Sequence, residues 1–178
     1  TNWLSKYLKE KKINCDIAFC PERVVQGHGI EEIKSLPQIV SGTTKKAEDK
    51  AAELFKMVAP TIVRLTCMET ELAKLFSNAF RYIQFAATNQ FYKIATEAGV
   101  DYHRLLNGMK LNYPRLRDLP GPGFAAGPCL HKDTMQLSAF YQNKFSMGQA
   151  AMLVNEGLPL FLVDQLAKKY NLPELTIG

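Results

Sequence analysis

The stretch from Met68 to Val100 constrains the fold of this chain more than any other. It contains no proline, and its only glycine, Gly99, stands next to its end. Apolar residues recur at helical spacing from Leu72 to Ala98. The pattern therefore predicts a single helix of over thirty residues, roughly 45 Å long at 1.5 Å per residue. Because a helix of that length exceeds the width of a small domain, we expect it to pack against a partner as well as against its own domain.

Short strands and helices alternate before the long helix. The segments CDIAFCPE, LPQIVSG and TIVRLT favour strands, residues 1–12 favour an amphipathic helix, and KKAEDKAAELFKMV favours a helix that Thr43 or Thr44 caps. This alternation is typical of a parallel α/β sheet. Three strands are too few for a complete sheet of this class, so we expect residues 1–65 to be the end of a larger α/β domain.

Helices also dominate the chain after the long helix. Asp101 is expected to cap a short helix over YHRLLNGM, and two further helices are expected over KDTMQLSAFYQNK and MGQAAMLVNEGLPLFLVDQLAKKY. The last of these is apolar and could serve packing or an oligomer interface. The predicted fold class is a mainly α-helical domain over residues 66–178, preceded by the end of an α/β domain.

Composition and charge exclude several classes of protein. The 178 residues are 47% hydrophobic and 22% charged, which is ordinary for a globular protein. No apolar run is long enough to cross a bilayer, and the start TNWLSKYLKEKK is not a signal peptide, so we expect a soluble, cytoplasmic protein with no membrane partner. The net charge of +5 would attract a polyanion, but no basic patch interleaved with aromatic residues indicates a nucleic-acid partner. The chain begins without methionine, so we expect a fragment.

The four cysteines form no Cys-x-x-Cys pair, so neither a metal site nor a disulfide framework is expected. Cys15, Cys20 and Cys67 lie in apolar surroundings typical of strands and are expected to be buried. Cys129 differs, because it stands in GPGFAAGPCLHKD, residues 121–133. Gly and Pro break regular structure and small residues allow close approach, so a helix is expected only after this cysteine.

Charged and amide side chains accompany the cysteine. A helix N-terminus near Asp133 and the neighbouring Lys132 favour the reactive thiolate form of a cysteine. Lys74 and Asn78 are four residues apart on the long helix and emerge from one face, and Glu22 follows a predicted strand. Each feature alone also fits an ordinary exposed pair, a loop carboxylate or a charge at a helix N-terminus. Together they describe a nucleophile, an acid, an amine and an amide.

Five blocks carry a resemblance to a known family. CPERVVQG, LPQIVSG, ELAKLFSNAFRYIQFAATNQ, PGPGF…C…KD and LVNEGLP occur in this order. Together they resemble the UDP-glucose/GDP-mannose dehydrogenase family, the NAD-dependent nucleotide-sugar 6-dehydrogenases, over nearly the whole chain. The resemblance implies that residues 1–65 are the C-terminal portion of the Rossmann-like dinucleotide-binding domain, and that residues 66–178 are the central domain, which would form a homodimer. It also implies that the Gly-x-Gly-x-x-Gly turn and the C-terminal nucleotide-sugar domain are absent, so the fragment alone is expected to be inactive.

The resemblance further implies a chemistry. Family members oxidise C6 of a nucleotide sugar to a carboxylate in two hydride steps, through a cysteine thiohemiacetal and thioester. Cys129 would be the nucleophile, Lys74 and Asn78 would stabilise the oxyanion, Asp133 would assist proton transfer through a water, and Glu22 would act as acid and base in hydrolysis. The other implied contacts are with substrate, by Arg115, Gly121, Gly123, Phe124 and Ala125, and with NAD, by Gln26 and Lys132.

The sugar and the reaction class stay open at this point. The loop departs from the family pattern Gly-Phe-Gly-Gly-Ser-Cys, because Ala125, Ala126, Gly127 and Pro128 follow Phe124. PERV and NYPR lean towards UDP-N-acetylhexosamines, whereas KD after the cysteine leans towards UDP-glucose. One alternative is a two-electron β-hydroxyacid dehydrogenase of the 6-phosphogluconate type, which needs no cysteine. Another is a non-catalytic helical dimerisation module.

Overall fold

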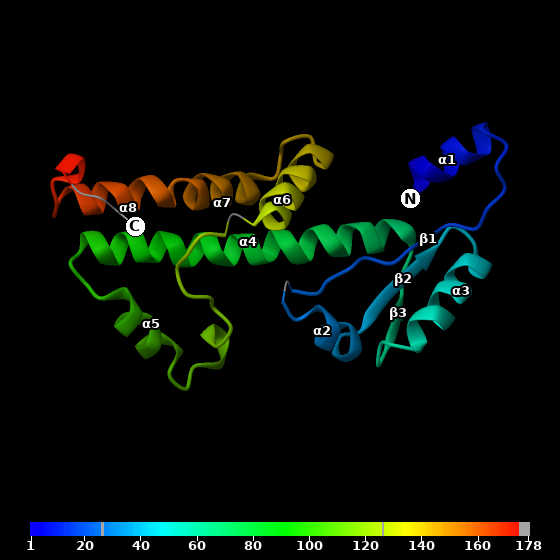
Figure 1. The fold of residues 1–178 in the computed structure, drawn as a ribbon, viewed down its shortest axis with the longest axis horizontal. Helices are drawn as coiled ribbons and strands as arrows, with labels where there is room; N and C mark the ends of the chain where they lie inside the picture. Colours follow the sequence, from blue (N-terminus) through cyan, green and yellow to red (C-terminus); the bar gives the residue numbers. More distant parts are fainter. Residues whose placement is uncertain (26, 126, 175–178) are drawn as a thin grey trace. The chain divides into compact units, whose positions relative to one another are not determined.

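The computed structural model describes residues 1–25, 27–125 and 127–174. The chain divides into two compact units, Thr1–Phe76 and Ser77–Gly178. The mainly helical fold with one long helix is confirmed, and Figure 1 shows its elements in order.

The first unit contains a three-stranded sheet. Its elements are α1 (Asn2–Glu10), β1 (Ala18–Phe19), α2 (Gly29–Ser35), β2 (Gln38–Gly42), α3 (Lys45–Lys56) and β3 (Ile62–Arg64). The strands lie in the order β1-β2-β3, and β2 and β3 are parallel as predicted. The prediction was wrong for β1, which pairs with β2 in the antiparallel sense. Parallel pairing requires a crossover that packs on the sheet; α3 supplies one, whereas α2 has no buried residue.

The core of the first unit lies between β2 and α3. Val40 is fully buried against Ala51 and Ala52 of α3. The predicted cap is confirmed, because the Thr44 hydroxyl accepts a hydrogen bond of 3.1 Å from the Ala47 N–H. Gly42 allows this tight turn, since a Cβ there would stand 2.4 Å from a backbone nitrogen of α3.

All the regular elements that the structure describes in the second unit are helices. Most of α4 (Cys67–Glu97) belongs to it, followed by α5 (Tyr102–Lys110), η1 (Pro114–Leu116), α6 (Pro128–Phe140), α7 (Ser146–Glu156), α8 (Leu158–Ala167) and η2 (Leu172–Glu174). The single long helix and the Asp101 cap on α5 are both confirmed. The prediction of one helix over residues 147–170 was wrong, because the chain breaks at Gly157 between α7 and α8. Pro159, in the first turn of α8, has no N–H for a continuing helix and would clash with the carbonyl one turn earlier.

The core of the second unit lies where α4 meets α7 and the loop before α6. Tyr82, Ala86, Ala125 and Ala151 form one buried cluster. Figure 1 shows α7 and α8 running along α4, and the Lys93 ammonium of α4 donates a 3.2 Å hydrogen bond to the carbonyl of Val154 on α7. A second cluster of Ala95, Tyr102 and Leu106 joins α4 to α5. The long helix is therefore the element on which the rest of this unit packs.

The cysteine environments differ from the prediction. Cys15 is exposed, and Cys20 and Cys67 are only partly buried. Cys67 opens α4 instead of lying in a strand, because the β3 pairing ends at Arg64. Burial raises the pKa of the Cys20 thiol. Across the described parts of the chain, no helix has the length and apolar character needed to span a membrane, and no group of three or more His, Cys, Asp or Glu side chains could hold a metal ion.

Candidate active site

Cys129 lies at the start of a helix. The prediction that the helix begins only after this residue was wrong, because α6 starts at Pro128, and Cys129 is its second residue. Proline favours the first helical position, where its fixed φ suits the helix and its missing N–H has no partner to lose. The Cys129 side chain is exposed. Negative charge that develops near its sulfur would face the N-terminal end of α6, where the first N–H groups have no partner within the helix.

Asp133 follows one turn later on α6. Residues four apart on a helix share a face, so Asp133 lies below Cys129 on the same side. Its carboxylate is 5% exposed and accepts a 2.6 Å hydrogen bond from the side-chain amide of Asn78, itself 7% exposed. The Lys132 ammonium lies 3.4 Å from the other carboxylate oxygen, with its own side chain mostly exposed. The second unit thus brings together Asn78, Asp133 and Lys132 from the predicted set, and places Cys129 one helical turn from Asp133.

Lys74 and Glu22 meet in the first unit. The Lys74 ammonium donates a 2.6 Å hydrogen bond to the backbone carbonyl of Glu22. The Glu22 carboxylate is exposed and accepts from the N–H of Val24, two residues on. The pair is therefore adjacent, although the lysine contacts the glutamate through its main chain. Along α4, Lys74 precedes Asn78 by one turn, so both side chains emerge from one face.

The glycine loop, defined as residues 121–125, leads towards α6. Phe124 is 64% exposed, whereas Ala125 is 4% exposed and packs in the core. A Cβ added at Gly121 or Gly123 would meet no described neighbouring atom within 4 Å. These glycines are therefore not required by packing against the described residues. They leave the backbone open to close approach by another molecule.

Two other predicted residues have different positions. Arg115, on η1, is exposed, and its guanidinium lies 5.4 Å from the centre of the Tyr113 ring. Gln26 lies outside the described residues. The structure thus gives Arg115 a stacking partner within its own segment.

Sequence reasoning missed a buried amide network beside the glycine loop. Asn89 on α4 is fully buried, and it bonds both Gly123 and Asn155 of α7. A signal existed, since asparagine is a poor residue for the middle of a helix unless its side chain has a specific partner. Asn89 also lies eleven residues after Asn78, which is about three helical turns and therefore the same face.

Tyr82 extends this network and gives a pH-dependent prediction. Burial, and then the Glu156 carboxylate that accepts the 2.7 Å bond from its hydroxyl, raise the pKa of Tyr82. A raised pKa in the folded state means that the associated stability is complete below the unfolded pKa of about 10 and declines as the pH rises above it. Urea unfolding of the parent should therefore show the unfolding free energy falling by up to about 1.4 kcal/mol per pH unit above about pH 10. The variant Tyr82→Phe should lack this part of the decrease. Tyr141→Phe, at an exposed tyrosine, is the control. An unfolding free energy with the same pH dependence in the parent and in Tyr82→Phe would contradict the prediction.

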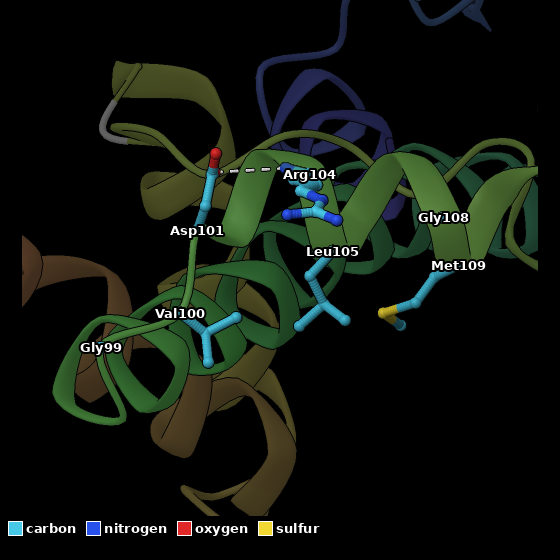
Figure 2. Close-up of a pocket in the computed structure, with 7 residues that line it drawn as sticks. All are labelled: Gly99, Val100, Asp101, Arg104, Leu105, Gly108 and Met109. Atoms are coloured by element: carbon cyan, nitrogen blue, oxygen red, sulfur yellow. Dashed lines mark hydrogen bonds between the residues drawn. The ribbon is translucent and has the colours of Figure 1, made fainter.

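Two hollows of the second unit lie around α5, and no residue that lines them belongs to the predicted site. Figure 2 shows one in which Val100, Leu105 and Met109 project to the same side, while Asp101 caps the helix through the N–H of Arg104. A neighbouring hollow shares those three apolar residues and is lined almost entirely by carbon; it adds Phe91, Ile94, Ala95, Ala98 and Tyr102. Together they form an apolar surface on α4 and α5, which we call the α4–α5 surface.

Comparison with known proteins identifies the family. Residues 68–157, about half of the chain, match the family model described as the UDP-glucose/GDP-mannose dehydrogenase family, central domain. The UDP-N-acetyl-D-mannosamine dehydrogenase of Methanocaldococcus jannaschii is 31% identical over 165 residues, which are 92% of this chain and 38% of the relative. The NDP-N-acetyl-D-galactosaminuronic acid dehydrogenase of Ralstonia nicotianae is also 31% identical, over 88% of this chain and 38% of the relative.

Solved structures agree with this result. The UDP-D-ManNAc dehydrogenase from Pyrococcus horikoshii matches with a TM-score of 0.87 and 26% identity, over 94% of this chain and 41% of that one. A UDP-glucose dehydrogenase from Pyrobaculum islandicum, at 23% identity, shares the fold with a TM-score of 0.81, over 93% of this chain and 40% of that one. The chain spans less than half the length of these relatives. On the family match, the chain belongs to the UDP-glucose/GDP-mannose dehydrogenase family.

Proposed function

We propose that this chain is part of an NAD-dependent dehydrogenase that oxidises C6 of a nucleotide sugar to a carboxylate in two steps. In this proposal, residues 1–65 end the dinucleotide-binding domain and residues 66–178 form the central domain. The observation that carries the proposal is the buried Asn78–Asp133 pair, one helical turn from the exposed Cys129 at the N-terminus of α6. A two-electron dehydrogenase of the 6-phosphogluconate type would have no use for that thiol.

The described residues do not by themselves form a dinucleotide site. The sequence has no Gly-x-Gly-x-x-Gly turn, and Lys132, predicted to face NAD, has an exposed side chain that lies beside Asp133. NAD, when bound, would supply the oxidising power by accepting hydride.

Cys129 would hold the substrate between the two oxidations. Its thiolate adds to the C6 aldehyde, and the carbonyl oxygen gains a proton to give a thiohemiacetal. Loss of a hydride and a proton from this adduct gives a thioester. Water then adds at the carbonyl carbon, and the C–S bond breaks to release the carboxylate and the thiolate. Covalent capture keeps the reactive aldehyde bound until the second oxidation.

Lys74 and Asn78 would stabilise the oxyanion that forms in these additions. A side-chain amide carries two N–H donors, and one of those of Asn78 is used by Asp133. The ammonium of Lys74 would supply a positive charge, and each such donor commonly contributes about 2.7–4 kcal/mol to the transition state. Asp133 would accept a proton through a water, and Glu22 would serve as acid and base in thioester hydrolysis.

The names of the relatives favour an N-acetylated sugar. Relatives from Methanocaldococcus jannaschii and Yersinia pestis, each 31% identical, are both named UDP-N-acetyl-D-mannosamine dehydrogenase. We therefore propose a UDP-N-acetylhexosamine as substrate, with UDP-N-acetyl-D-mannosamine as the first compound to test. UDP-glucose is the second candidate.

Initial rates of NADH formation test the substrate class. The protein that carries this chain, expressed at the full length of its gene, is offered NAD with UDP-N-acetyl-D-mannosamine, UDP-glucose or 6-phosphogluconate. The proposal expects the highest kcat/KM with the first compound and none with the third. Turnover of 6-phosphogluconate alone would contradict it in favour of the two-electron relatives.

The homodimer belongs to the same proposal. Phe91, Ile94 and Leu105, on the α4–α5 surface, are each exposed by 43–56%. Exposed apolar surface of this kind marks contact with another protein. Sedimentation should find a dimer of the parent protein, and Ile94→Asp and Leu105→Asp should each weaken that dimer. A parent that is monomeric at micromolar concentration would exclude this interface.

A further inference from the structure

The backbone N–H and the backbone carbonyl of Gly123 are both bound by one side chain. Asn89 accepts a 2.9 Å hydrogen bond from the Gly123 N–H and donates a 3.0 Å bond to the Gly123 carbonyl. One side chain thus binds the donor and the acceptor of a single residue, as a neighbouring strand would. The two bonds also fix which end of the Asn89 amide faces which group, because an N–H can only donate and a carbonyl can only accept.

The second donor of Asn89 is held from the opposite side. It binds the side-chain oxygen of Asn155 on α7 at 2.9 Å, and Asn155 in turn donates to the backbone carbonyl of Tyr82 at 3.0 Å. Asn89 and Asn155 are 0% and 4% exposed. Because buried amides are stabilising only when their bonds are satisfied, this chain of bonds admits one arrangement of α4, α7 and the loop.

The anchor acts on a segment outside regular secondary structure. No helix or strand covers residues 117–125. Within the glycine loop, Gly123 is held by Asn89 and Ala125 by burial in the core, while Phe124 between them is 64% exposed. Fixing both neighbours of Phe124 holds its side chain outward. The bonds to Asn89 also fix the backbone of Gly123, where an added Cβ would meet no described atom within 4 Å.

We infer that Asn89 is a positioning residue that holds the glycine loop in register for the nucleotide sugar, with Asn155 fixing its amide. This inference rests on the proposed function, in which the loop backbone lies along the sugar and pyrophosphate. Asn89 does not touch substrate; it acts through Gly123. A displacement of about 1 Å in such a segment can lower catalysis by about 100-fold.

The first test measures the anchor without any activity. Amide exchange by NMR is followed at Gly123 in the full-length protein, for the parent, Asn89→Ala and Thr88→Val. Thr88 is the matched control, since it is the preceding residue, equally buried, and its hydroxyl pairs with that of Tyr102 at 2.6 Å and not with the loop. Exchange at Gly123 should be about tenfold faster in Asn89→Ala and unchanged in Thr88→Val. Parent-like exchange in Asn89→Ala would overturn the inference.

The second test measures the positioning role. In the full-length enzyme, Asn89→Ala should raise the KM for the nucleotide sugar about tenfold and lower kcat, with the KM for NAD unchanged. Thr88→Val should leave both KM values as in the parent. Equal changes in the two KM values of Asn89→Ala would show a merely structural role and overturn the inference. So would a loss of kcat that follows only the decrease in unfolding free energy in both variants.

A second variant and the exchange measurement distinguish failure of the inference from failure to fold and from failure of the proposed function. If Asn89→Ala does not fold, Asn155→Ala is measured instead. This variant keeps the two bonds between Asn89 and Gly123 but removes the third bond of Asn89, so a smaller acceleration of exchange at Gly123 is expected. Parent-like exchange there would overturn the inference. If the full-length parent oxidises no nucleotide sugar, the proposed function and the positioning role both fail, whereas the exchange measurement still decides whether Asn89 anchors the loop.

Discussion

The variant Cys129→Ala of the full-length protein is expected to form the uronic acid product at least about 10⁴-fold more slowly than the parent, with nucleotide-sugar binding retained. The reason is that the variant cannot form the thiohemiacetal, which the second oxidation requires. Its methyl side chain still fits the second position of α6, so folding should not change. The measurement is the steady-state rate of uronic acid formation, together with binding of the nucleotide sugar by calorimetry.

A matched control is available in the same chain. Cys15 is also an exposed free thiol, but it lies between α1 and β1, outside the predicted site. Cys15→Ala should keep the parent rate within about twofold, as expected for an exposed position away from structural features. A Cys129→Ala enzyme as active as Cys15→Ala would remove the thiol from the reaction and exclude the covalent mechanism.

Asn78→Ala is expected to lower both the stability and the activity of the protein. It leaves Asp133, which is 5% exposed, without its 2.6 Å partner. Leaving a buried acceptor unsatisfied costs about 1–3 kcal/mol, and more for a charged group. Because the same amide is proposed to bind the oxyanion, kcat should fall by a further factor of about 10²–10³. Urea unfolding of the 178-residue chain and turnover of the full-length enzyme measure the two effects separately.

Asp133→Asn separates structure from chemistry at this pair. The new amide oxygen can still accept the bond from Asn78, so the unfolding free energy should change by less than about 1 kcal/mol. The variant has no carboxylate to accept a proton, so turnover should fall by about 10²–10⁴-fold. A double-mutant cycle between Asn78→Ala and Asp133→Ala should give a coupling of about 0.5–3 kcal/mol, as for residues in direct contact. A coupling near zero would mean that the bond does not hold the site together.

Local signals predicted the helices best. The α4 segment lacks interior proline and glycine, and its apolar residues keep one helical spacing from end to end. The helix can therefore be predicted without knowledge of any tertiary contact. A cap at Asp101 and one at Thr43 or Thr44 can be predicted locally, because the partners of such caps are backbone N–H groups within three residues. The same reasoning failed at α7 and α8, where Gly157 and Pro159 outweighed an apolar pattern.

Features that depend on distant partners could not be predicted in this way. The antiparallel pairing of β1 is decided by where the chain turns between two short strands. The family resemblance implies roles for Lys74 and Glu22 in one reaction, whereas the bond from Lys74 to the Glu22 carbonyl follows from the fold. Asn89 received no role because its partners, Gly123 and Asn155, are 34 and 66 residues away in the sequence.

The central claim is that one nucleotide sugar is oxidised twice at a single cysteine. The most direct measurement is the number of NADH molecules formed for each molecule of UDP-N-acetyl-D-mannosamine consumed by the full-length protein, with the substrate limiting and NAD in excess. The account predicts two NADH per sugar and a uronic acid as the product. One NADH per sugar, with an aldehyde or ketone as the final product, would contradict it.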